Sequence, residues 1–281
     1  MPGIRKTDIF IPSGEEAETA FARTTDLAVG AHPDDVELMA VHGILACYGR
    51  EDRAFSAVVL SNGAGSPRNG KFQDFSDRQM AEARMKEQKK AAIIGEYAAV
   101  VQMGFSSRAV TDPDHSGLTE ELAELIRKMR PRTMYIHNPA DRHLTHVAAC
   151  MRAIEALLSL DPADRPERLY GCEIWRSLDW MEEKDRTILD TSGYEQLKAE
   201  LIRAHRSQVE GGKRYDRASE GRQRANATFL ASHRTDRMSA AACAVDLTPV
   251  LSGADVEDYI TGAIDRFRED VVRKIRSVRR G

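Results

Sequence analysis

The sequence predicts an α/β fold: a Rossmann-like, mostly parallel sheet with helices on both faces. Five apolar runs rich in β-branched residues alternate with segments long enough to form helices, which is typical of right-handed βαβ units. With 281 residues, of which 42% are hydrophobic and 30% charged, the chain can bury one large core. We therefore expect a single domain over residues 1–281, with an N-terminal extension at 1–25 and a C-terminal helical elaboration at 209–281.

The elements can be placed by composition and periodicity. The expected parallel strands are Asp26–Ala31, Phe55–Ser61, Ala98–Gly104, Thr133–His137 and Arg168–Trp175. The helices expected between them are Val36–Tyr48, Ser76–Ile94, Leu118–Lys128 and Thr145–Leu158, and the charge of Ser76–Ile94 on most faces suggests that it lies in solvent. Later in the chain we expect helices at Tyr194–Ser207, Tyr215–His233 and Val256–Val278, and a strand at Ala241–Leu247. The common strand order 3-2-1-4-5 would make strands 1 and 4 neighbours.

A cluster of polar residues ends the first strand. His32, Asp34 and Asp35 follow the apolar run directly, and Pro33 restricts His32 to extended backbone. Imidazole and carboxylate together suit Zn²⁺, and a second carboxylate is a natural acceptor for the proton of the attacking water. An N-cap would explain one aspartate, but not both aspartates and the histidine.

A second cluster follows the fourth strand. His143 and His146 are three positions apart, a spacing that puts two side chains on one face of a helix, and Asp141 precedes them. Because ligands bind at the carboxyl ends of strands flanking the switch point of such sheets, the two clusters should meet. We expect one zinc site there, at the C-terminal ends of strands 1 and 4.

The overall composition excludes several classes of protein. The formal net charge of −3 gives no reason to expect a nucleic-acid partner, and the short basic run at 273–280 suits the negative end of a helix. No window approaches 18 apolar residues, and the N-terminus lacks the apolar core of a signal peptide. The four cysteines are scattered without a CxxC pair, which favours reduced thiols and a cytoplasmic location. The sequence leaves open whether the protein forms a homo-oligomer.

These motifs resemble the PIG-L or LmbE-like deacetylases, zinc enzymes that remove acetyl groups from N-acetylglucosamine-containing substrates. The resemblance covers most of the chain, from about residue 27 to 208. It rests on the motif at 32–37 and on the histidine pair. Supporting it are the glycine-rich turn at 62–65, the pattern Arg84-x-x-Glu87-x-x-x-Ala-Ala-x-x-x-Gly95 and the segment at 204–208.

The resemblance implies a role for each residue. His32, Asp35 and His146 would bind zinc, Asp34 would act as general base, and His143 would stabilise the oxyanion or protonate the leaving amine. One position departs from the family pattern: relatives often carry an aspartate immediately before the last zinc ligand, where this chain has Thr145. This departure leaves the protonation state of His143 open and weakens the transfer of any particular substrate.

The resulting hypothesis is a zinc-dependent hydrolase that deacetylates an amino sugar or its conjugate. Arg68 and Asp141 are candidates for substrate binding, and His205 for support of the site. One alternative is a nucleotide-sugar-dependent transferase, although the first strand lacks the Gly-x-Gly-x-x-Gly that phosphate binding would require. Another is a metal-binding protein that has lost turnover because of Thr145.

Overall fold

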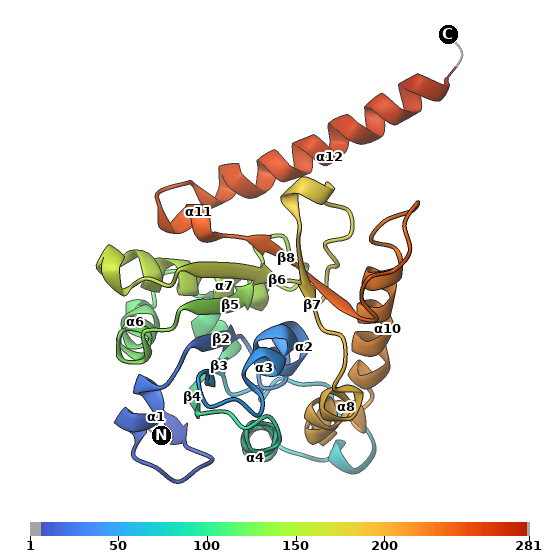
Figure 1. Cartoon of the computed structure of the whole chain (residues 1–281). Coiled ribbons are helices and arrows are strands. Elements are labelled where there is room, and N and C mark those ends of the chain that lie inside the picture. Colours follow the sequence, from blue (N-terminus) through green and yellow to red (C-terminus); the bar gives the residue numbers. More distant parts are fainter. Residues whose placement is uncertain (1–6, 280–281) are drawn as a thin grey trace.

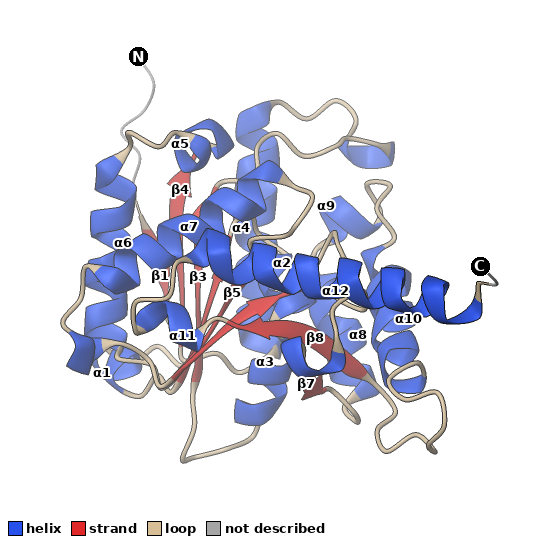
Figure 2. Cartoon of the chain, turned by 90° about the horizontal axis from the view of Figure 1, so that it is seen from above, coloured by secondary structure: helices blue, strands red, loops and turns tan. Residues whose placement is uncertain are grey.

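The computed structural model describes residues 7–279 and contains one eight-stranded sheet with helices on both faces (Figures 1 and 2). Its strands are β1 (Asp8–Phe10), β2 (Asp26–Gly30), β3 (Phe55–Ser61), β4 (Ala99–Phe105), β5 (Thr133–His137), β6 (Arg168–Cys172), β7 (Thr187–Asp190) and β8 (Ala241–Asp246). They lie in the order β1-β4-β3-β2-β5-β6-β8-β7. Since one sheet runs through the described chain, we propose that it is one domain.

The five central strands confirm the expected topology. β4, β3, β2, β5 and β6 are parallel, and β2 pairs with both β3 and β5. The first and fourth expected strands are therefore adjacent. β8 also lies within the expected range, but antiparallel to β6. The edge strands β1 and β7, of three and four residues, were not predicted because such short runs carry no clear alternation.

The helices on the two faces differ in length and continuity. Their bounds are α1 (Ala17–Ala22), α2 (Asp35–Met39), α3 (Val41–Cys47), α4 (Asp77–Ile94), α5 (Ser107–Thr111), α6 (Ser116–Met129), α7 (Leu144–Leu158), α8 (Glu195–Ala204), α9 (Arg206–Val209), α10 (Tyr215–Thr228), α11 (Thr248–Leu251) and α12 (Val256–Val278). Two helices expected to be continuous are interrupted, at Ala40 and at His205. The expected helix at 215–233 ends at Thr228, and the fifth strand ends at Cys172.

Two apolar clusters hold the sheet between its helices. One packs α6 and α7 against side chains such as Val29 and Ile136, and the other packs α2 and α3 against the opposite face, including Ala28 and Tyr135. The alternation along β2 and β5 explains this, because successive side chains of a strand point to opposite faces. Both central strands are thereby fixed from two sides where they end.

The helix α4 is not the solvent-facing element that its charge suggested. A capping box formed by Ser76 and Gln79 begins it. Its inner face then carries Met80, Arg84 and Gln88, all buried, at a spacing of four residues. Arginine and glutamine are buried only when their polar groups find partners. In α4 these partners belong to the polar cluster at the end of β2.

Within residues 7–279, no helix is both long enough and apolar enough to span a membrane.

Candidate metal centre

The loop after β2 brings His32 and Asp35 together. The strand is fully buried, and the chain turns at Pro33 so that Asp35 becomes the first residue of α2. The backbone N–H of His32 donates to Asp35 Oδ2 at 2.7 Å, and Nδ1 of the same histidine lies 3.1 Å from that oxygen. A four-residue turn therefore holds an imidazole and a carboxylate side by side.

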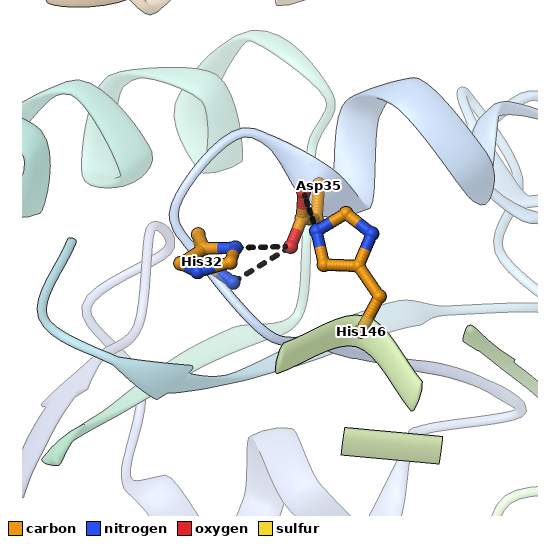
Figure 3. A group of neighbouring side chains, drawn as sticks. All are labelled: His32, Asp35 and His146. Carbon is orange, nitrogen blue, oxygen red and sulfur yellow. Dashed lines mark hydrogen bonds and ion pairs between the residues drawn. The ribbon is translucent and has the colours of Figure 1, made fainter. Parts of the chain in front are cut away.

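His146 completes the group from the other side of the switch point. It lies in the first turn of α7, and its Nε2 is 3.4 Å from Asp35 Oδ1. Figure 3 shows the carboxylate of Asp35 between the two imidazole rings. One ligand atom from each of His32, Asp35 and His146 falls within 4.8 Å of the others. The structure thus brings together the three residues expected to bind metal.

The donor set fits a catalytic divalent metal. Two imidazoles and one carboxylate are ligands that Zn²⁺ accepts, and three protein ligands leave a position open for water or substrate. Asp35 and His146 are buried, while His32 is partly exposed toward a cavity of about 490 Å³. Although burial opposes ionisation of Asp35, the neighbouring His146, His32 and His137 hold its pKa well below the usual range. Its carboxylate is therefore ready to bind a cation.

Asp141 supports His146 from behind. Its Oδ1 lies 3.8 Å from Nδ1 of His146, while it accepts hydrogen bonds from the backbone N–H of His143 at 2.9 Å and of Trp175 at 3.1 Å. Burial raises the pKa of Asp141, but His146 and the His143 N–H outweigh it and lower the value to about 2. Asp141 is thus an ionised group behind a candidate ligand, and the residues lining the cavity do not include it.

His137 is a buried neighbour of the centre that was not among the site residues predicted from the sequence. It ends β5, accepts a hydrogen bond from the backbone N–H of Ala31 at its Nε2, and stacks on His146 with ring centroids 4.0 Å apart. Burial and the proximity of His146 lower its pKa to about 4, so the ring is neutral at pH 7. Its position at the end of the fourth parallel strand was the available signal.

Asp34 is held apart from the ligands by an unusual backbone. Its φ of 98° lies in the left-handed region, which costs about 1–3 kcal/mol for a residue other than glycine. This turn sends its carboxylate to Arg84, whose Nη2 donates to Oδ1 at 2.7 Å and also to the carbonyl of Pro33. Its backbone N–H donates to Gln88 Oε1 at 3.1 Å. Burial raises the pKa of Asp34 to about 6 despite the neighbouring guanidinium.

The glycine-rich turn at 62–65 makes room for this arginine. Gly63 has a φ of 66°, and a Cβ at that position would lie 2.8 Å from Arg84 Nη1. The guanidinium also donates to Ser66 Oγ in the same loop. Position 63 therefore requires glycine, because any side chain there would collide with the guanidinium of Arg84. Arg68, in contrast, donates to Ala64 O and to Asp77, and it does not itself line the cavity, although Ser66 and Pro67 just before it do.

A buried carboxylate connects His205 to this arrangement. Glu37 Oε2 lies 2.9 Å from His205 Nε2, and Glu37 Oε1 accepts hydrogen bonds from Tyr97 Oη and from Gln88 Nε2. Gln88 in turn holds the backbone of Asp34. His205 is therefore two residues removed from Asp34, at the break between α8 and α9.

Stability should depend on pH through this buried pair. Burial lowers the pKa of His205, but the carboxylate of Glu37 outweighs burial and raises it. The stabilisation by protonated His205 is then fully present below its unfolded pKa of about 6.5 and lost as pH rises through the higher folded value. Glu37→Gln should reduce the free energy of unfolding by about 3 kcal/mol at pH 6. It should lose less stability than the wild type between pH 6 and 9.

Urea unfolding of both proteins at a series of pH values measures this effect. A control is Glu82→Gln, since Glu82 is an exposed glutamate of α4 that pairs with Arg78 and does not contribute to the pKa of His205. Equal pH slopes for Glu37→Gln and the wild type would show that the pair does not contribute in this way.

The cavity wall beside the centre contains His143 and three larger side chains. His143 precedes α7 with extended backbone, so helical periodicity does not place it as the sequence suggested. Its ring is nevertheless 4.7 Å from that of His146 and 5.3 Å from that of His32. Trp175 stacks beside it, and Lys213 and Tyr215 lie against the indole. Burial, His146 and His32 lower the pKa of His143.

Comparisons with known proteins agree with this arrangement. The family described as PIG-L: GlcNAc-PI de-N-acetylase matches residues 27–158. Comparison with curated proteins gave no match.

Several solved structures share the fold. A conserved protein of Thermus thermophilus is 23% identical, with 79% of this chain and 94% of that one covered and a TM-score of 0.60. The N,N'-diacetylchitobiose deacetylase of Pyrococcus horikoshii is 16% identical, with 83% and 88% covered and a TM-score of 0.57. The 4-carboxy-2-hydroxymuconate hydratase of Pseudomonas putida is 20% identical, with 80% and 96% covered and a TM-score of 0.56.

Because a hydratase and a deacetylase share this fold, the fold alone does not fix the reaction. The family match carries more weight, since the matched segment contains His32, Asp35 and His146 as well as Asp34 and His143. Residues 27–158, just under half of the chain, match the PIG-L (LmbE-like) deacetylase family.

Proposed function

We propose that this protein is a zinc-dependent hydrolase that removes the acetyl group from an N-acetylglucosamine-type amino sugar or its conjugate. One observation carries the proposal. A two-histidine, one-carboxylate group lines an open cavity beside a second carboxylate, Asp34, that belongs to no ligand set and points to Arg84. A structural metal site would need no such neighbour, whereas hydrolysis of an amide needs a proton acceptor near the attacking water.

His32, Asp35 and His146 would hold the ion. A zinc ion bound there would polarise the amide carbonyl and lower the pKa of the attacking water. Asp34 accepts the proton of that water, and Arg84 fixes the direction of its carboxylate. Asp141 and His137 hold the ring of His146 in place.

His143 and the wall beside it act on the other side of the amide. In its protonated form the His143 imidazolium stabilises the developing oxyanion, or it delivers a proton to the leaving amine. Trp175 offers a flat apolar face at the cavity wall, where the ring of a sugar would pack. The products are acetate and a free amino sugar.

The experiment is a panel of N-acetylglucosamine, its 1- and 6-phosphates and an alkyl glycoside, each incubated with zinc-loaded protein. Free amine and acetate are measured separately and should appear in equal amounts. Chelation should stop the reaction, and added Zn²⁺ should restore it. Metal binding without amine release from any member of the panel would favour the alternative function, that of a metal-binding protein that has lost turnover because of Thr145.

The His143→Ala variant should retain metal but lower kcat by about 10²- to 10³-fold, the range for loss of one group that stabilises an oxyanion. Steady-state kinetics at saturating substrate measure this, with metal content determined on the same sample. Arg142→Ala is a control, because Arg142 is an exposed neighbour in the same loop. An unchanged kcat in His143→Ala would show that this residue lines the cavity without taking part in the reaction.

A further inference from the structure

A second cavity, of about 210 Å³, adjoins the metal cavity. Trp175 and Tyr215 line both cavities, and their rings meet edge to face with centroids 6.2 Å apart. Helix α2, which begins at the candidate ligand Asp35, contributes Leu38 to the wall of the second cavity. Three residues are less than one turn of an α-helix, so this wall stands close to the metal centre.

The wall of the second cavity is largely apolar. Leu38 is the one residue of α2 that is not buried, and Ile174, Ala218 and Ala242 line the cavity with it. Ala218 is exposed on α10, so the cavity reaches the surface of the molecule there. Since an apolar cavity of about 150 Å³ can hold benzene, this one is large enough for a phenyl ring or a short alkyl chain.

The charged and amide side chains of this wall are hydrogen-bonded within the protein. Both carboxylate oxygens of Glu173 accept bonds from backbone N–H groups, each at 3.0 Å. The amide of Gln223 accepts a hydrogen bond from Thr191 and donates one to Ser219. Arg222 donates to a backbone carbonyl beside the cavity. A ligand would therefore gain more here from burial of apolar surface than from new hydrogen bonds.

We propose that the second cavity binds an apolar aglycone of the substrate, so that the preferred substrates are N-acetyl amino sugars joined to an alkyl or aryl group. This inference rests on the proposed deacetylation and narrows its substrate class. The metal centre would hold the amide and Trp175 the sugar ring, and Trp175 is a side chain that the two cavities share. The aglycone then lies over the edge formed by Trp175 and Tyr215, with its end beside Leu38.

The test compares amine release from the methyl, butyl, hexyl and octyl glycosides of N-acetylglucosamine by the metal-loaded protein. The value of kcat/KM should be at least about tenfold higher for the hexyl than for the methyl glycoside, because each buried methylene adds favourable transfer free energy. It should level off once the cavity is full. Calorimetry with hexyl and methyl glucoside, which have no acetamide, makes the same comparison without turnover.

Two substitutions in the wall test the location of the aglycone. Ala218→Leu fills the cavity at its opening and Leu38→Ala removes part of its wall, so each should lower the hexyl-to-methyl ratio of kcat/KM by at least about fivefold. Metal content is measured on the same samples, because Leu38 lies close to Asp35 in α2. Ala163→Leu is the matched control, since Ala163 is exposed as Ala218 is and lines neither cavity. It should leave the ratio unchanged.

The outcomes separate this inference from the proposed function. Amine release at equal kcat/KM along the series would overturn the inference and leave deacetylation standing. So would a preference that follows the acyl group, with N-hexanoylglucosamine cleaved faster while the alkyl glycosides are all alike. Amine release from no member would contradict the proposed function. Tighter binding of hexyl than of methyl glucoside, weakened in Ala218→Leu, would then still support an apolar ligand in this cavity, and equal binding would overturn that as well.

Discussion

His146→Ala is expected to lose the bound metal and, with it, all measurable amine release. This histidine is one of three groups that can donate to the ion, and its ring is buried between Asp35 and Asp141. With one ligand removed, the remaining imidazole and carboxylate cannot define a three-ligand site. Elemental analysis of the purified variant should find well under one metal per chain, where the wild type should hold one.

His115→Ala serves as the control, since that ring packs on Phe105 and is not among the residues that line the metal cavity. Both metal-free variants should keep the fold, although His146→Ala removes a buried ring and should unfold at a lower urea concentration than His115→Ala. Full metal occupancy in His146→Ala would show that His146 is not a ligand. The next candidate ligand would then be His137, the buried ring that stacks on it.

Asp34→Asn is expected to have the opposite combination: metal retained, turnover nearly lost. The amide keeps the size of the side chain and can still accept a hydrogen bond from Arg84, but it cannot take a proton from water. Loss of a positioned general base lowers the rate by about 10²- to 10⁴-fold. The measurement compares kcat and metal content of this variant with those of Asp35→Asn, in which metal binding itself should weaken.

The adjacent aspartates therefore form a matched pair, alike in chemistry and burial but opposite in expected effect. If Asp34→Asn and Asp35→Asn lose metal equally, the division into base and ligand is wrong. If Asp34→Asn loses neither metal nor turnover, the proton acceptor lies elsewhere in the cavity.

The topology and the candidate ligands could be predicted from the sequence, because both depend on the pattern of apolar runs along the chain. Buried parallel strands read as apolar runs, and the doubly wound order makes strands β2 and β5 neighbours. Residues following both strands must then meet, which brings His32 and His146 together although 114 positions separate them in the sequence. Helix breaks, in contrast, depend on local backbone geometry that hydrophobic periodicity does not report.

The polar support of the site was harder to predict. Arg84, Gln88 and Glu37 are buried, but polarity alone suggests that such residues are exposed. Each is buried only because another buried polar residue forms a hydrogen bond with it. Pairings between residues about 50 positions apart in the sequence cannot be derived from composition. His143 was selected for its spacing, yet its place at the centre comes from the loop before α7.

The left-handed backbone of Asp34 and the buried charge of Arg84 together decide how this position could change. Glycine would adopt the conformation of residue 34 without strain, a relief worth about 1–3 kcal/mol. The same substitution would leave the buried guanidinium of Arg84 without its carboxylate partner, at a cost of about 3–5 kcal/mol. Selection for thermal stability alone would therefore have to replace Asp34 and Arg84 together, and a variant stabilised in this way would lack the proposed proton acceptor.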